Sequence, residues 1–347
     1  MMSLAETIRQ LSGLMGVSGD EFAVSGEAAR LLAPYVDEVE TDSFGNVTGR
    51  KRCGLPNAPK LLLDAHIDQI GLFVTHITEE GFLRFVAPGV DQRMLPGSEI
   101  RLKTREGGEL FGVVLAMPTQ LQKPKERENS ATSEDMLVDM GLTGPQAKRR
   151  IRVGDALTFV GGALDLDGGT LTGPAMDDRA CFACILYALE LLQNQSLAVD
   201  LIVTGSTREE AGLQGAREAS WREKPDFAIA VDVCHGKTAD TKNMLTLEVG
   251  KGPVISVGAN SLPELARMMM EIARAQQIPY QVEALGGFSG TNAWSMQTVQ
   301  SGVSTLIVSL PLKYMHSPVE LLSVQDAENT GKLLACFVGQ FTGRVGW

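Results

Sequence analysis

The sequence predicts an α/β fold in which an open mixed sheet carries helices on both faces and a small β-barrel domain is inserted. Three observations support this prediction. Short, nearly continuous apolar runs resemble buried strands, helices and strands alternate after about residue 177, and the segment in between has short strands with almost no helix. With 347 residues and 44% hydrophobic content, the chain is long enough for two domains.

The N-terminal part predicts two helices, a hairpin and a buried strand. The amphipathic segment 3–16 has Ser3 as its candidate N-cap, and residues 18–36 form a second helical segment. Alternating residues around the turn signal at 44–46 indicate a hairpin. The run PKLLLDAHID, residues 59–68, is typical of a strand covered on both faces.

Residues 69–159 are expected to form the inserted β-rich domain. Short segments with strand character follow one another there, and only residues 143–150 suggest a helix. The chain then returns to alternating helices and strands, ending in a helix at 323–341. We therefore predict one α/β domain from residues 1–68 and 160–347, interrupted by the insert.

Composition and charge exclude several classes of partner. The net charge of −11, without any basic stripe, argues against a nucleic-acid partner. No apolar run reaches the length of a membrane span and the N-terminal segment has no signal-peptide core, so we expect no membrane partner. The five cysteines are few and odd in number, which favours a cytoplasmic location.

Acidic residues and histidines stand where predicted strands end or where a helix begins. These residues are His66, Asp177, Asp178, Glu209, Glu210, Asp232 and His316. Ligands of open α/β sheets bind outside the carboxyl ends of the strands, so we expect five ligands among these residues, two histidines and three carboxylates, to gather at one edge of the sheet.

Such a set of side chains can bind two divalent metal ions. A pair of ions ~3.5–4 Å apart needs one shared ligand and further ligands for each ion. Mixed nitrogen and oxygen ligands suit zinc, cobalt or manganese. Asp68 can hold the imidazole of His66 and fix its tautomer. In the adjacent pair Glu209 and Glu210, one carboxylate would bind an ion while the other takes a proton from a metal-bound water.

Several motifs make the sequence similar to the M42 family of metallo-aminopeptidases, the group that forms tetrahedral TET particles. They are GVSGDE, TDSFGNV, AHIDQIG, AMDDRA, TREEAGLQGA, IAVDV and KYMHSP, and they extend over nearly the whole chain. The resemblance implies the fold of the dinuclear zinc exopeptidases, with a PDZ-like insert that forms dimers.

The resemblance also implies a ligand set for two divalent ions per subunit, with zinc as the first expectation and cobalt or manganese as alternatives. Asp177 bridges the ions, His66 and Asp232 bind one of them, and Glu210 and His316 bind the other.

The resemblance further implies an aminopeptidase that removes N-terminal residues from short peptides. Glu209 is then the general base and acid that activates a metal-bridging water, and Asp68 is the orienting carboxylate. A cis peptide is expected between Asp177 and Asp178. We also expect a homo-oligomer, from a dimer to a dodecamer, with exposed strand edges of the insert as the self-association surface.

Three residues depart from the usual family pattern. Gln69 stands in place of Glu, Asn292 in place of Asp, and Lys313 where Arg is commoner. None of them belongs to the expected ligand set, so they bear on substrate preference and on the surroundings of the site.

Other functions are compatible with parts of the pattern. A dinuclear metal deacylase or carboxypeptidase-type amidohydrolase would keep the same site. A non-catalytic metal-binding assembly protein would keep the metals, although an intact Glu209 argues against it. A glycanase needs two carboxyls that flank a sugar bond, and it leaves the histidines without a role.

Overall fold

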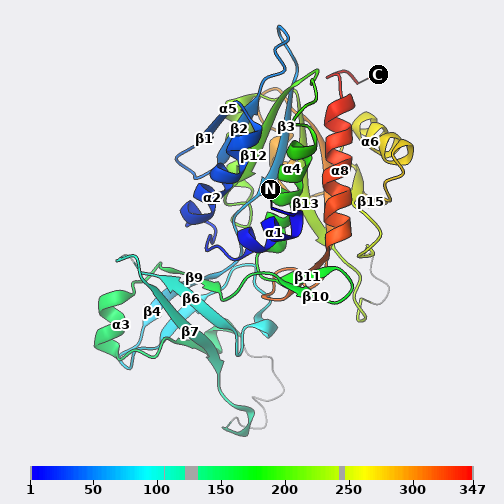
Figure 1. The fold of residues 1–347 in the computed structure, drawn as a ribbon. Coiled ribbons are helices and arrows are strands. Elements are labelled where there is room, and N and C mark those ends of the chain that lie inside the picture. The colour runs from blue at the N-terminus through cyan, green and yellow to red at the C-terminus, as the bar shows by residue number, and fades with distance from the viewer. Residues whose placement is uncertain (1, 105, 122–131, 242–246, 346–347) are drawn as a thin grey trace. The chain divides into compact units, whose positions relative to one another are not determined.

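The protein is described here by a computed structural model covering residues 2–104, 106–121, 132–241 and 247–345. The chain divides into two compact units, and Figure 1 labels many of their elements. The first unit consists of Met1–Asp68, Gly162–Met315 and Val319–Trp347, and the second of Gln69–Gly161 and His316–Pro318.

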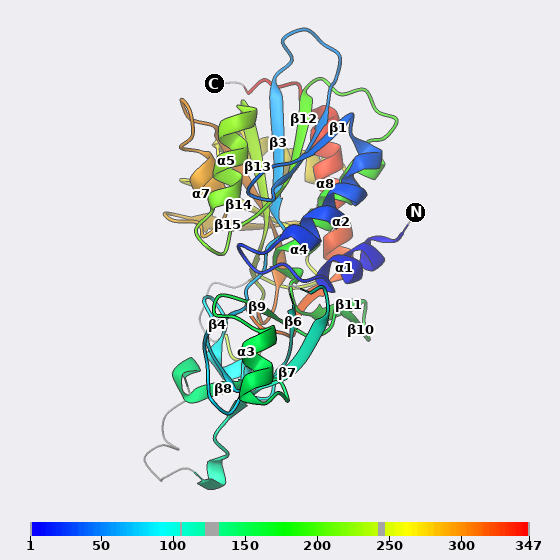
Figure 2. The ribbon, with the colours of Figure 1, turned by 90° about the vertical axis from the view of Figure 1, so that its left-hand side faces the viewer.

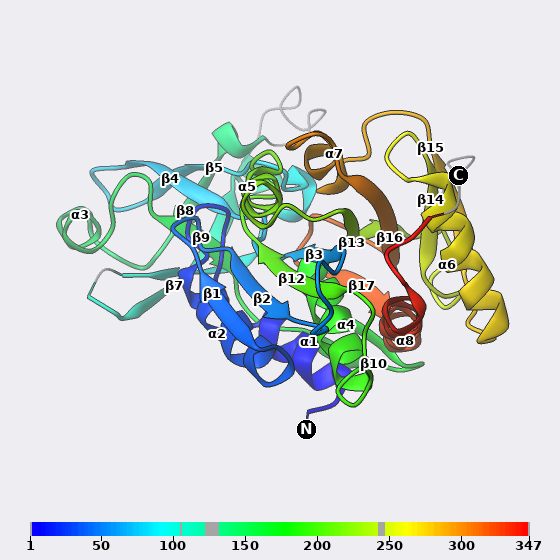
Figure 3. The same ribbon diagram turned by 90° about the horizontal axis from the view of Figure 1, so that it is seen from above.

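The first unit is built on a mixed sheet, as predicted. Within the described residues its strand order is β1-β2-β12-β3-β13-β16-β14-β15 (Figure 3). The central strands β12, β3, β13 and β16 are parallel, whereas β1 and β2 at one edge and β14 against β16 are antiparallel. The strands are β1 Glu38–Thr41, β2 Val47–Lys51, β3 Lys60–His66, β12 Asp200–Ser206, β13 Phe227–His235, β14 Val254–Gly258, β15 Gln281–Leu285 and β16 Ser304–Leu312.

Helices cover both faces of this sheet. The larger hydrophobic core includes residues of α1, α2, α4, α6 and α8, and a smaller core on the other face includes residues of α5 and α7 (Figure 3). The helices are α1 Leu4–Ser12, α2 Phe22–Leu32, α4 Met176–Leu191, α5 Gln214–Glu223, α6 Pro263–Ala275, α7 Ala293–Met296 and α8 Val324–Gln340. No helix in the described ranges is long and apolar enough to cross a membrane.

Local sequence explains the first elements. Ser3 caps α1 through a capping box with Glu6, which satisfies N–H groups at the helix start. In β3, Leu61 and Leu63 pack into the larger core and Leu62 into the smaller one. The continuous apolar run therefore lies in a strand buried on both faces, as predicted.

A second, smaller sheet of the first unit was not predicted. It has the strand order β10-β11-β17 and is antiparallel. Its strands are β10 Leu164–Leu166, β11 Thr170–Gly173 and β17 Glu320–Ser323. β17 pairs with a strand about 150 residues earlier in the chain, and local periodicity does not reveal such a partner.

The second unit is a closed barrel with its own core, and its described residues include one short α-helix, α3 (Figure 2). The strand order is β4-β5-β8-β7-β6-β9. Closure pairs both sides of each strand, so the expectation of exposed strand edges is wrong. The elements are β4 Leu72–Ile77, β5 Leu83–Val86, β6 Glu99–Lys103, β7 Glu109–Ala116, β8 Met136–Asp139, α3 Gly144–Arg150 and β9 Ala156–Phe159.

Candidate metal centre

Strand pairing brings His66 and Asp232 to the same level of the sheet. β3 and β13 pair in parallel up to Asp64 and Ala230, and His66 and Asp232 each lie two residues beyond that pair. The ladder between these strands stops there, which leaves room for side chains. β13 itself continues beside β16, so Asp232 lies within its strand and not at the end, where the sequence had suggested it.

His66 lies at the centre of a cluster of carboxylates. Its Nε2 is 3.1 Å from Oδ1 of Asp177 and 4.0 Å from Oδ1 of Asp232. Its backbone N–H donates to Oδ2 of Asp178 at 3.2 Å. Asp177 and Asp178 are joined by a cis peptide, as expected. Two sets of ligand atoms each lie within 4.8 Å of one another, namely those of His66, Asp177 and Glu210 and those of His66, Asp178 and Asp232.

If the acids of this cluster were all ionised, their negative charge would exceed what the surrounding protein compensates. Burial, reinforced by neighbouring carboxylates, raises the pKa of Glu209 to about 10 and that of Asp232 to about 8. It also raises the pKa of Asp178 well above its ordinary value, and Oδ1 of this residue is buried without a hydrogen-bond partner. A divalent cation would relieve this excess, so the donor set fits a metal site.

The imidazole of His66 has one nitrogen available for such a cation. Nδ1 lies 3.3 Å from Oδ1 of Asp68, and Nε2 faces Asp177 and Asp232. Burial by itself lowers the pKa of His66, but the hydrogen bonds to Asp177 and Asp68 raise it well above its ordinary value. Without a metal, the protonated ring therefore supplies positive charge at the centre of the cluster.

Asp68 links this histidine to the pair of glutamates. Its Oδ1 accepts the N–H of Glu209 at 3.0 Å and its Oδ2 accepts the N–H of Glu210 at 3.2 Å. Burial opposes ionisation of Asp68, yet the hydrogen bond and charge of His66, with the other donors, lower its pKa. Asp68 thus remains a carboxylate at neutral pH.

His316 belongs to the second unit. Its Nδ1 donates to the backbone carbonyl of Gly89 at 2.9 Å, which leaves Nε2 as the nitrogen that could bind a metal. Its backbone carbonyl accepts the N–H of Asp91. The role of His316 as a ligand stays a prediction.

Sequence reasoning gave some residues near the cluster no role of their own. Asp178 was named only as the neighbour of Asp177, although its carboxylate also approaches His66. Ser18, whose hydroxyl donates to Oδ2 of Asp68 at 2.6 Å, and Glu21 belong to the motif GVSGDE. This motif is the signal in the sequence that could have identified Ser18 and Glu21 as neighbours of the site.

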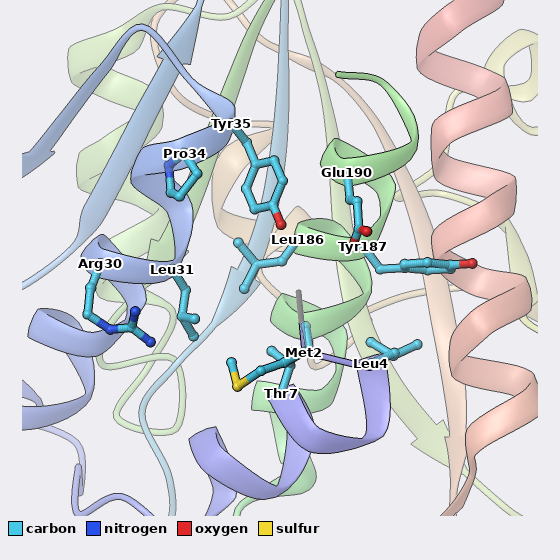
Figure 4. Close-up of a pocket in the computed structure, with 11 residues that line it drawn as sticks. Met2, Leu4, Thr7, Arg30, Leu31, Pro34, Tyr35, Leu186, Tyr187 and Glu190 are labelled. Atoms are coloured by element: carbon cyan, nitrogen blue, oxygen red, sulfur yellow. The ribbon is translucent and has the colours of Figure 1, made fainter. Parts of the chain in front are cut away.

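A surface pocket of the first unit is formed by other parts of the chain (Figure 4). Segments of α1, α2 and α4 line it, with Arg30, Tyr35, Tyr187 and Glu190 among the side chains. No residue of the His66 cluster lines this pocket. The carboxylate cluster, and not the pocket, is therefore the candidate site.

Comparisons with known proteins identify the family of this chain. The M42 glutamyl aminopeptidase family model matches residues 45–333. A lysyl aminopeptidase of Pyrococcus furiosus is 36% identical over 334 residues, which cover 94% of this chain and 94% of the relative.

Solved structures show the same similarity. Aminopeptidase APDkam598 from the archaeon Desulfurococcus kamchatkensis has a TM-score of 0.89 and 30% identity, covering 98% of this chain and 95% of that chain. The TET1 peptidase of Pyrococcus horikoshii, described as able to assemble into a tetrahedron or a large octahedral shell, has a TM-score of 0.85 and 28% identity, covering 98% and 100%. The chain belongs to the M42 glutamyl aminopeptidase family.

Proposed function

We propose that this protein is a metallo-aminopeptidase that removes N-terminal residues from short peptides with two divalent metal ions. The observation that carries the proposal is a cluster with two sets of ligand atoms, each within 4.8 Å of one another: His66 with Asp177 and Glu210, and His66 with Asp178 and Asp232. Membership of the family and the name of the lysyl aminopeptidase relative support the reaction class.

Five residues form the proposed ligand set. Asp177 is shared, His66 and Asp232 serve one ion, and Glu210 and His316 serve the other. The mixture of imidazole and carboxylate favours zinc, with cobalt or manganese as alternatives. Bound divalent ions supply Lewis-acid chemistry, which polarises the scissile carbonyl and lowers the pKa of water to about 7.

Glu209 is the proposed general base and acid. It would take a proton from the attacking water as the oxygen–carbon bond forms, and pass it to the amine nitrogen as the carbon–nitrogen bond breaks. Burial and neighbouring carboxylates raise its pKa to about 10 in the metal-free cluster. Bound cations would lower that pKa, so that the carboxylate could accept a proton near neutral pH. The hydrogen bond from its backbone N–H to Asp68 supports a defined position.

The relatives favour an aminopeptidase over the other hydrolases. The matching family model is that of the M42 glutamyl aminopeptidases, and the relative from Pyrococcus furiosus is named a lysyl aminopeptidase. A deacylase or carboxypeptidase-type amidohydrolase would prefer a blocked amine or a free carboxylate.

A panel of aminoacyl-anilides and their N-acetylated analogues tests the proposal, with metal analysis of the same preparation. We expect chelator-sensitive hydrolysis of the free-amine substrates only. Equal or faster cleavage of the acetylated analogues would indicate a deacylase. Bound metal with no hydrolysis of either series would indicate a non-catalytic assembly protein.

We also propose that the protein is a cytoplasmic homo-oligomer, from a dimer to a dodecamer, with the barrel unit as its dimerisation domain. Val86, Phe111 and Val113 project from β5 and β7 with exposed fractions of 47%, 59% and 44%. Apolar side chains of this kind favour association. The assemblies named for the TET1 peptidase and the free state of all five cysteines are consistent with this proposal.

A further inference from the structure

The backbone N–H groups of four consecutive residues, 207–210, are all accepted by side chains from the first 68 residues. Oδ1 of Asn46 accepts the N–H of Thr207 at 2.9 Å. Oε1 of Glu21 accepts the N–H of Arg208 at 3.1 Å. The two oxygens of Asp68 accept the next two, at 3.0 and 3.2 Å. We call this arrangement the amide cradle.

The cradle holds a backbone conformation that the chain does not favour by itself. Arg208 has φ 55°, in the left-handed region that side-chain-bearing residues rarely adopt. Such a conformation is strained and persists where its surroundings impose it. The Arg208 guanidinium also lies over the ring of Phe44, 4.5 Å from its centroid. This turn sets the direction in which the next two residues, Glu209 and Glu210, leave the sheet.

Glu21 is a charged member of the cradle that has no role of its own in the proposed reaction. It is 2% exposed, and its Oε1 accepts the N–H of Gly19 at 2.7 Å as well as that of Arg208. Ser18, three residues earlier, donates to the Asp68 carboxylate that holds the two glutamate amides. The loop 18–21 therefore contacts the segment 207–210 in two ways. Glu21 accepts a hydrogen bond from it directly, and Ser18 binds Asp68, which accepts two more.

We propose that Glu21 is a positioning residue for Glu209. By accepting the Arg208 N–H, it locks the peptide that precedes Glu209 and keeps the general base aimed at the attacking water. The inference rests on the proposed aminopeptidase function for its catalytic consequence, while the locking of the turn is a property of the fold alone. An error of about 1 Å in the position of a reacting group lowers a rate by up to about 100-fold.

Two substitutions separate positioning from charge. Glu21→Ala removes the acceptor, and we expect kcat to fall by about 10–100-fold with KM and metal content within about twofold. Glu21→Gln keeps an oxygen that can accept both N–H groups, and we expect kcat within about threefold of the parent. If Glu21→Ala does not fold, Glu21→Met replaces it, because Met fills similar space without an oxygen.

Asp326 offers a matched control. Its carboxylate accepts two backbone N–H groups, those of Gly250 and Gly252, and it is buried as Glu21 is. Asp326→Ala should lower the melting temperature as Glu21→Ala does and leave kcat of the folded protein within about twofold. An equal fall of kcat in both variants would reduce Glu21 to a general stabilising role and overturn the proposal.

Hydrogen–deuterium exchange of the metal-free protein supplies a readout that does not depend on activity. We expect the amides of 207–210 to exchange at least about threefold faster in Glu21→Ala, with no such change in Asp326→Ala. Unchanged exchange at 207–210 would overturn the inference even in an active enzyme. Faster exchange in a protein without peptidase activity would support the locked turn and count against the proposed function instead.

Discussion

The side-chain amide of Asn292 donates a 2.7 Å hydrogen bond to Oδ2 of Asp64, and a second one of 2.9 Å to Oγ of Ser206. All three residues are buried, and burial raises the pKa of Asp64 to about 7. Asn292 is one of the departures from the family pattern, which has Asp at this position. An aspartate there would place two carboxylates face to face beneath the site.

We therefore predict that Asn292→Asp lowers the free energy of unfolding by about 1–3 kcal/mol at pH 8, because like charges would be buried together and a donor would be lost. The loss should shrink at pH 5, where a protonated carboxyl can donate. Urea unfolding at both pH values measures it. The double variant Asp64→Asn/Asn292→Asp exchanges amide and carboxylate and should recover most of the stability. An Asn292→Asp protein as stable as the parent at pH 8 would contradict the pairing.

The second prediction concerns Glu209. Glu209→Gln should keep the metal content but lower turnover by at least ~10²-fold, the lower range for loss of a general acid–base. Glu210→Gln is the matched comparison, because Glu210 is a proposed ligand and its substitution should lower the metal content. Metal analysis and steady-state rates on one aminoacyl-anilide decide between the two roles. Metal loss in Glu209→Gln, with no separate catalytic defect, would make Glu209 a ligand.

The neighbouring aspartates should differ in their effect on metal binding. Asp177 is the proposed bridging ligand, whereas Oδ2 of Asp178 already accepts the backbone N–H of His66. We expect Asp177→Asn to lose most of both ions after dialysis and Asp178→Asn to retain at least one. The reverse order would show that the set His66, Asp178 and Asp232 is the one that binds.

The pH dependence of the metal-free protein follows from the buried cluster. Burial raises the folded-state pKa of Glu209 to about 10 and of Asp232 to about 8, above ordinary values of 4.5 and 3.8. At pH values between the unfolded-state and the folded-state pKa, the folded protein holds protons that the unfolded chain has released. The free energy of unfolding therefore falls as pH rises. The raised pKa of His66 acts in the same direction, since its contribution is lost as pH rises through the folded-state value.

We expect the melting temperature of chelator-treated protein to fall from pH 5 to pH 9, and the fall to be smaller in Asp232→Asn. Added zinc should raise the melting temperature most at the alkaline end, where the carboxylates are ionised and free of protons. Scanning calorimetry with and without metal measures both effects. A melting temperature that rises with pH in the metal-free protein would contradict the charge assigned to the cluster.

The last prediction concerns assembly. Light scattering of the metal-loaded protein should give a mass of at least twice the 37.2 kDa of one chain. Phe111→Asp places a charge among the exposed apolar residues of the barrel and should lower that mass, because a charge is costly to bury in an interface. Arg149→Glu, at an exposed position of α3, is a control for a charge change elsewhere on the same unit, because Arg101 and the other β6 residues lie directly beside Phe111 and its strand. A parent protein near 37 kDa would leave the oligomer without support.

Much of the fold follows from local patterns in the chain. The apolar runs at Leu61–Leu63 and in β12, β13 and β16 mark buried strands, and the capping box at Ser3 marks a helix start, because these signals depend on neighbouring residues only. The helices α5 and α7 and the strand β15 were not predicted. Their burial depends on partners far along the chain, and α7 has only four residues.

The sequence by itself determined which side chains follow the buried strands, and so which acids and histidines are candidates for a metal site. The order of strands and their common direction then bring His66, Asp177, Glu210 and Asp232 together. Only the tertiary structure decided the rest: Asp178 as a second carboxylate beside His66, the bond between Asn292 and Asp64, and the cradle that holds residues 207–210. Each of these joins groups more than 100 residues apart, and hydrogen bonds at that separation depend on the packed fold, whereas strand and helix periodicity depends on residues a few positions apart.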